Sequence, residues 1–318
     1  MKNRILWLDN LKAFLILVVV LSHSIIFTEN DSESNVLLRF IVSFQMPLFM
    51  FVSGFVSYKH SPSLSVISRR FKQCVIPFFI WSLIICLIKC NWHIESVLLY
   101  PVNGTWFLWA LFWINSLVVI CCSLSKKYHI PEEISCIILA LCLIVINKLL
   151  PDSNLLAINL IALHFINFSI GYFSRKYIEY LMMIPKKVFL ICSGAFFILA
   201  YFNKGNFMFA GLPSSLHVIL DIMCGFFSFS LFVPFFLKFL DRKIPFVSNL
   251  GGMTLGIYVV HIGIFTWLIH HNILSTDMGG MLYALYVTIL TIIVFFLTYV
   301  ICFVIEKSRV LSKVLLGK

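Results

Sequence analysis

The chain has 318 residues, of which 61% are apolar and only 12% are charged. A soluble domain carries roughly 25% charged residues, so this composition excludes a water-soluble globular protein and predicts one that is embedded in lipid. The net charge of +11 does not indicate a nucleic-acid partner, because Lys and Arg stand in short clusters between apolar runs and are not interleaved with aromatic residues.

Taken in chain order, the apolar runs predict an all-α polytopic bundle of about ten transmembrane helices. The expected helices span residues 8–28, 36–57, 73–90, 105–124, 134–149, 154–174, 187–203, 214–238, 251–270 and 280–305. The first follows Lys2 and Arg4 as in a signal peptide, but Asp9 and Lys12 interrupt it and no small-residue cleavage site follows. We therefore expect this helix to be retained.

The distribution of basic residues predicts how the bundle is oriented. Of the 24 Lys and Arg residues, 19 fall on one side of the expected spans, four fall on the other side, and Lys12 lies within the first helix. Because cytoplasmic loops are enriched in Lys and Arg, both termini are predicted to be cytoplasmic. The short loops, with no soluble segment appended, predict a single integral membrane domain over residues 1–318.

Sequence motifs argue against several kinds of chemistry. No P-loop, GxGxxG, HExxH or GxSxG pattern stands in a suitable context, and no paired carboxylates lie inside an apolar run. The ten cysteines form no CxxC pair and lie mostly within apolar runs, which indicates buried thiols rather than a metal or redox site. We therefore expect no metal and no tightly bound cofactor, which leaves basic residues and histidines as the chemical resource.

The first helix carries the most informative polar residues, because ionisable groups inside a membrane are costly and mark candidate functional sites. Asp9 and Lys12 are one turn apart and are expected to pair. Lys12 and His23 are 11 residues apart, which places them on one face with a rise of roughly 16 Å between them. This stripe predicts a cation near the cytoplasmic entrance and an imidazole deep in the span. Alternatively, Lys12 snorkels to the headgroups and His23 bonds a neighbouring helix.

Polar residues in later helices form a second candidate set. Tyr258 and His261 stand at i, i+3 in the ninth expected helix, where a lone His is usually a core residue. His217 and Asp221 stand at i, i+4 in the eighth. They either pair with each other or leave Asp221 to bind a hydroxylated acceptor or to orient another His. His164 lies in the middle of a span and is interpreted as structural.

An aromatic cluster and a basic cluster stand at the starts of two expected helices. Trp106 and Trp109 share a face at the outer start of the fourth, and predict either an interfacial anchor or a stacking platform for a sugar ring. Arg69, Arg70 and Lys72 stand just before the third, on the cytoplasmic side. They are either topology determinants or an anion site for a phosphorylated cofactor.

Four blocks of sequence occur in an order that is typical of one family. They are LDNLK at 8–12 with His23-Ser24 ten residues beyond it, SFQMPLFMFVSGF at 43–55, GTWFL at 104–108 and LGIYVVH at 255–261. Together they resemble the membrane acyltransferase-3 family, especially its sugar O-acetylase branch, similar to fucose 4-O-acetylase-like proteins. One position departs from the family pattern: Gln45 stands where the family usually has His, and Gln cannot shuttle a proton near neutral pH.

The resemblance implies O-acyl transfer, usually of acetyl from acetyl-CoA as co-substrate, to a hydroxyl of an envelope or surface polysaccharide or its lipid-linked precursor. It also implies a multi-pass protein of the bacterial cell membrane. His23 would be the general base, paired Asp9 and Lys12 would belong to the catalytic stripe, and Lys12 would stabilise the thioester oxygen or the CoA phosphates. The residues implied for CoA are Lys12, Arg69, Arg70 and Lys72; those implied for the acceptor are Trp106, Trp109, Asp221, Tyr258, His261 and Gln45. Of these, Tyr258 and His261 would support either His23 or the acceptor.

A second class of function stays open on the residues alone. A transporter or flippase for a glycan or glycolipid would also have about ten helices and intramembrane His and Asp residues. Transporters often consist of two similar halves, and the sequence shows no such repeat. The resemblance favours the acyltransferase. The acceptor sugar, an acyl-His intermediate versus direct transfer, and the oligomeric state stay open.

Overall fold

The computed structural model describes residues 5–58, 65–90, 93–150, 154–179, 185–202, 214–275 and 280–318, the side chains of 33, 186 and 214–218 excepted. Within these ranges the chain is helical and contains no β-strand. It divides into two compact units that interleave along the sequence. Unit 1 comprises Met1–Phe49 and Met183–Val304, and unit 2 comprises Met50–Met182 and Ile305–Lys318. The single domain expected over residues 1–318 stays a prediction.

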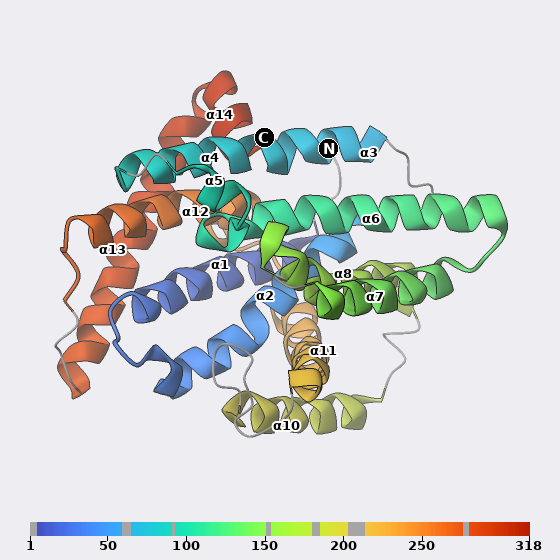
Figure 1. The fold of residues 1–318 in the computed structure, drawn as a ribbon. Helices are drawn as coiled ribbons and strands as arrows, with labels where there is room; N and C mark the ends of the chain where they lie inside the picture. The colour runs from blue at the N-terminus through green and yellow to red at the C-terminus, as the bar shows by residue number, and fades with distance from the viewer. Residues whose placement is uncertain are drawn as a thin grey trace. The chain divides into compact units, whose positions relative to one another are not determined.

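The ten helices that the apolar runs predict are all present, with ends that differ by a few residues in most cases (Figure 1). Unit 1 holds α1 (Leu6–Ile26), α10 (Lys186–Phe202), α11 (Ser214–Phe239), α12 (Pro245–His270) and all but the last two residues of α13 (Gly280–Glu306). The helix α2 (Val36–Ser57) begins in unit 1 and ends in unit 2. Unit 2 continues with α3 (Ser65–Arg70), α4 (Ile76–Ile88), α5 (Glu95–Leu98), α6 (Trp106–Tyr128), α7 (Glu132–Leu149), α8 (Ile158–Lys176) and α14 (Arg309–Leu316).

Eight helical segments of the described chain are long and apolar enough to cross a membrane, which establishes a multi-pass helical membrane protein. The other two expected spans are α7 and α10. The helix α7 carries three charged residues, Glu132, Glu133 and Lys148, within its 18 residues. The helix α10 has only 17 residues. Both are therefore marginal spans by length and composition.

The third expected helix begins eight residues earlier than predicted. The helices α3 and α4 join through a π-helical turn, Phe71–Val75, into one apolar segment from Ser65 to Ile88. Pro77, two residues after the turn, has no N–H to offer the carbonyl four residues back, and a π turn is one way in which a helix accommodates such a gap. Arg69, Arg70 and Lys72 consequently lie on a helix and not in the loop before one.

In unit 1, α1 packs along α12, and α10 packs against α11 (Figure 1). A group of aromatic rings fills the space between α1, the first half of α2, α10 and α11. Phe14 stacks on Phe44 with 6.2 Å between ring centroids and lies 5.7 Å from Phe232, while Phe44 lies 6.3 Å from Phe196. On the α13 side, the hydroxyl of Thr291 donates to Ser24 Oγ at 2.9 Å. These contacts hold α1 among the helices of unit 1.

In unit 2, the second half of α2 packs directly against α8 through two glycines. A Cβ at Gly171 would lie 2.7 Å from the carbonyl carbon of Phe51, and one at Gly54 would lie 2.9 Å from that of Phe168. Such close backbone approach is typical of helix pairs in membranes, where small residues form the interface. The packing of α2 against α8 therefore requires a glycine at both positions.

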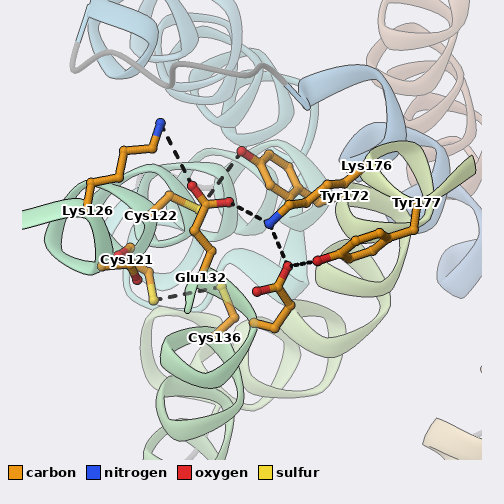
Figure 2. Close-up of polar contacts among 10 residues, drawn as sticks. Cys121, Cys122, Lys126, Glu132, Cys136, Tyr172, Lys176 and Tyr177 are labelled. Atoms are coloured by element: carbon orange, nitrogen blue, oxygen red, sulfur yellow. Dashed lines mark hydrogen bonds and ion pairs between the residues drawn. The ribbon is translucent and has the colours of Figure 1, made fainter. Parts of the chain in front are cut away.

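Figure 2 shows an ionic cluster that joins α6, α7 and α8 where α6 and α8 end and α7 begins. Lys176 contacts Glu132 at 3.3 Å and Glu133 at 2.6 Å, and Lys126 lies 3.9 Å from Glu132. The hydroxyl of Tyr177 donates to Glu133 at 2.5 Å. Because one ammonium bridges two carboxylates, the cluster fixes the α6–α7 hairpin against α8.

Candidate active site

An ion pair occupies the first turns of α1. Lys12 Nζ lies 2.9 Å from Asp9 Oδ1, which confirms the pairing expected from the i, i+3 spacing. Asp9 is buried and Lys12 is partly exposed. An ammonium has three N–H donors, so this bond does not exhaust the capacity of Lys12 to bind an anion.

Further along α1, His23 meets His261 of α12. His261 Nε2 lies 3.2 Å from His23 Nδ1, and the ring centroids are 5.0 Å apart. His23 is partly exposed, whereas His261 is fully buried. The helix runs without a break from Lys12 to His23, so the two lie roughly 16 Å apart along the axis and on one face, as predicted.

Both imidazoles are oriented by backbone carbonyls of their own helices. His23 Nδ1 lies 3.0 Å from Val19 O, and His261 Nδ1 lies 2.9 Å from Ile257 O. A carbonyl oxygen only accepts, so this network assigns the proton of each neutral ring to Nδ1. His261 Nε2 is then an acceptor for the Nδ1–H of His23. His23 Nε2 keeps its lone pair and has no hydrogen-bond partner among the described residues, which is the state that a general base requires.

The close approach of α1 and α12 depends on Gly251. A Cβ there would lie 2.7 Å from both Cα and the carbonyl carbon of Asp9, and closer still to its carbonyl oxygen. Only a residue without a side chain permits this spacing. Sequence reasoning did not single out Gly251, although a Gly-Gly pair inside a long apolar helix is a signal of close packing.

Asn10 fixes the same end of the helix pair. Its Nδ2 donates to Leu240 O at 2.7 Å and to Arg242 O at 3.0 Å, and its Oδ1 accepts from Ser248 Oγ at 3.0 Å. The side chain thereby binds the chain segment between α11 and α12, and its residue is only 1% exposed. The sequence offers one sign of this role, an amide side chain next to Asp9 in an apolar helix. It does not identify the partners of Asn10, which lie more than 200 residues away along the chain.

Aromatic side chains surround the histidine pair. The Phe27 ring centroid lies 5.6 Å from that of His23, and the Phe265 centroid lies 6.4 Å from it. Tyr258 is buried on α12, with its ring centroid 5.8 Å from that of His261. The pair therefore lies in largely apolar surroundings, in which hydrogen bonds are stronger than in water.

Two other predicted residues of unit 1 present unpaired buried acceptors. Gln45 and Asp221 are each 6% exposed. Neither Gln45 Oε1 nor Asp221 Oδ1 has a hydrogen-bond partner in the part of the chain that the structure describes. The side chain of His217, the other residue of the i, i+4 pair, lies outside the described residues. Each unpaired acceptor is costly in a membrane and is a candidate to receive a hydroxyl group.

Three of the four basic residues expected to bind CoA belong to unit 2, and they differ in exposure. Arg69 and Lys72 are exposed. Arg70 is partly buried: it donates to Ser57 Oγ at 2.8 Å and to Gln73 Oε1 at 3.3 Å. Arg70 thus has neutral partners in this structure, whereas Arg69 and Lys72 present their charges to the surroundings.

The two tryptophans expected to contact the acceptor, also in unit 2, are engaged by protein partners. Trp106 stacks on His164, with 5.5 Å between centroids and 13° between ring planes. Trp109 Nε1 donates to Leu156 O at 2.9 Å, and its ring lies 5.2 Å from that of Phe78. Both rings thus contact protein groups, and the roles expected of them, an interfacial anchor or a stacking platform for a sugar ring, stay predictions.

Comparison with known proteins places this arrangement in a family. The family model described as an acyltransferase domain, that of the acyltransferase-3 family, matches residues 5–306 and so includes residues of both units. No curated protein and no solved structure matches the chain. A match over nearly the whole chain, on a multi-pass helical bundle, is sufficient for assignment. The chain belongs to the membrane acyltransferase-3 family and is a membrane acyltransferase.

Proposed function

We propose that the protein is an O-acetyltransferase that moves acetyl from acetyl-CoA to a hydroxyl of an envelope glycan or its lipid-linked precursor, in a bacterial plasma membrane. The observation that carries the proposal is the state of His23. Its Nδ1 is bonded to Val19 O and His261 Nε2, while its Nε2 is left as a lone pair on a partly exposed residue. A sugar hydroxyl is a poor nucleophile, and a neutral imidazole in this state can take its proton during attack.

In the proposed reaction His23 is the one group that accepts and then returns a proton. The acceptor O–H bond breaks as its oxygen attacks the thioester carbonyl, and the proton passes to His23 Nε2. The new C–O bond forms, the C–S bond breaks, and the imidazolium returns the proton to the leaving CoA sulfur. His23 is therefore a base and then an acid in one cycle, and it ends neutral.

Lys12 is proposed to bind the phosphate groups of the donor. The rise of roughly 16 Å from Lys12 to His23 is too long for the ammonium to reach a thioester held at the imidazole. A donor with its charged phosphates at one end and its thioester at the other suits such a separation. Asp9 holds the ammonium in place at 2.9 Å, and at neutral overall charge the pair costs less to bury than a lone cation.

The acceptor is proposed to bind through Gln45 and Asp221. Their unpaired oxygens, Oε1 and Oδ1, belong to the same unit as His23, and each would accept a hydrogen bond from a sugar hydroxyl. This assignment gives the two buried acceptors a partner that the described protein does not supply. Gln45, as a neutral amide, would orient the substrate without exchanging a proton.

The basic residues of unit 2 carry a separate proposal for CoA. Arg69 and Lys72, which are exposed, are expected to contact a phosphate group. Arg70 would first have to break its hydrogen bonds to Ser57 and Gln73. A variant with both Arg69→Ala and Lys72→Ala should raise the acetyl-CoA KM and retain kcat. An unchanged KM would leave these residues as topology determinants.

The central test measures acetyl transfer in membranes. Wild-type membranes are incubated with radiolabelled acetyl-CoA and the host's lipid-linked glycan, and alkali-labile acetate on sugar is counted. His23→Ala should reduce the rate by about 10²- to 10⁴-fold, the usual contribution of a general base. The matched control is His270→Ala, which removes an exposed imidazole at the end of α12 and should leave the rate near that of the wild type. Wild-type activity in His23→Ala would eliminate His23 as the base, and glycan that crosses vesicles without gaining label would indicate a flippase.

A further inference from the structure

His261 contacts His23 through its Nε2, and this contact determines which nitrogen of the His23 ring carries the proton. Of the two ring nitrogens of His261, Nδ1 is 2.9 Å from Ile257 O and Nε2 is 3.2 Å from His23 Nδ1. Both nitrogens are therefore occupied within the protein. A residue with both nitrogens bonded in this way is poorly placed to bond an acceptor sugar as well.

We infer that His261 is a positioning residue for His23, and that it acts as a neutral hydrogen-bond acceptor that orients the base and stabilises the positive charge that develops on it. The inference rests on the proposed role of His23. Of the two roles that the resemblance implies for His261, support of His23 and contact with the acceptor, we thereby assign the first. The residue is fully buried, and it lies on α12, which packs along α1.

The direction of the hydrogen bond follows from the backbone. Because Ile257 O can only accept, the proton of neutral His261 is on Nδ1 and its Nε2 must accept. The Nδ1–H of His23 then points toward His261 Nε2 and Val19 O, and the lone pair of His23 stays on Nε2. When His23 Nε2 takes the substrate proton, the ring becomes positive, and its Nδ1–H bond to His261 becomes charge-assisted and stronger. An interaction that strengthens only as charge develops lowers the barrier to reaction.

Val19 O alone does not make His261 redundant. The Val19 carbonyl lies one turn back in α1, so it moves with the helix that carries His23. His261 comes from a different helix, 238 residues away, and ties the imidazole to α12. The ring is thereby held by two acceptors from two elements, which restricts its rotation more than either acceptor alone would.

The test compares two substitutions at His261, each made in the wild type and in a His23→Ala background, in full-length protein in membranes. His261→Leu removes the acceptor, whereas His261→Gln supplies an amide oxygen that can accept the same N–H. His261→Leu should lower kcat by about 10- to 100-fold, as loss of a partner that orients a functional His typically does. The KM values for acetyl-CoA and for the acceptor should both stay near wild type. His261→Gln should recover most of the lost kcat, and the same variants in a His23→Ala background should cause no further loss.

The outcomes separate this inference from the function on which it rests. If His23→Ala is fully active, the proposed role of His23 is refuted, and the inference about His261 is refuted with it. If His23→Ala is inactive while His261→Leu keeps wild-type kcat, only the positioning role fails. If His261→Leu raises the acceptor KM and leaves kcat intact, His261 binds substrate instead. If Leu and Gln variants lose activity equally, in step with a lower thermal midpoint, the residue is merely structural and the inference is overturned.

Discussion

Adding a single methyl group at Gly251 should separate the two helices that carry the histidine pair. In Gly251→Ala the new Cβ would start 2.7 Å from two backbone carbons of Asp9, whereas ordinary contact begins at 3.4 Å. Backbone on both sides cannot rotate away, so α1 and α12 must move apart by at least about 0.7 Å. If that shift is carried along the helices, the His261 Nε2 to His23 Nδ1 distance grows from 3.2 Å to about 3.9 Å and the bond is lost.

Two quantities should change in this variant. Overpacking of this kind typically costs about 1–3 kcal/mol, so the thermal midpoint of the purified protein should fall. Acetyl transfer should fall in kcat by as much as in His261→Leu, because both remove the same hydrogen bond. Gly194→Ala is the matched control: it adds the same methyl in the interior of α10, where no described atom apart from the neighbouring backbone of the helix itself lies within 4 Å of the new Cβ. That variant should keep its activity and its midpoint, since Ala favours a helix over Gly.

The reasoning is refuted by a Gly251→Ala protein with wild-type kcat and midpoint, because the backbone contact would then not be as tight as the structure has it. A lower midpoint with unchanged kcat would separate the two claims. It would confirm close packing at Gly251 and show that the displacement does not reach His23.

Two further predictions concern an acceptor residue and the ionic cluster. Asp221→Leu removes an unpaired buried acceptor, so the thermal midpoint should stay equal or rise. The KM for the glycan should rise about tenfold, because one hydrogen bond to a substrate hydroxyl is lost. An unchanged KM would contradict the acceptor role. Burial opposes ionisation of Glu133, but hydrogen bonds from Lys176 and Tyr177 lower its pKa below the ordinary value. Its stabilising effect should be complete above about pH 4.5 and disappear as pH falls through the lowered pKa. Midpoints measured against pH should therefore fall less on acidification in Glu133→Gln, whereas equal acid sensitivity would eliminate this contribution.

The fold was largely predictable because hydropathy alone places helices in lipid. Every backbone group must be paired inside a bilayer, so an apolar run of sufficient length has few alternatives to a helix. The rule fails where the sequence is short and charged. The helix α14 has only eight residues with Lys and Arg among them, and nothing in its pattern shows that Trp81 Nε1 donates to Leu315 O at 2.9 Å.

The site was predictable within a helix and not between helices. Helical periodicity places Lys12 and His23 on one face and pairs Lys12 with Asp9, because those relations depend only on spacing along one element. The bond between His23 and His261 joins residues 238 positions apart. Its existence depends on Gly251, which lets the backbones approach, and on Asn10, which holds the segment before α12. Periodicity identifies the face that a residue occupies but not its neighbour in another helix.

The chemical character of the pair suits its surroundings. A His–carboxylate pair would place a full negative charge in the bundle throughout the cycle, and a buried charge is costly unless it is paired. Two neutral imidazoles carry no charge at rest, and in the proposed reaction a positive charge exists only while His23 holds the substrate proton. Permanent charge on α1 is confined to the Asp9–Lys12 ion pair in its first turns, which compensates itself. This division shows, in physical terms, how one helix could hold both the proposed donor-binding cation and the proposed base without a buried carboxylate beside that base.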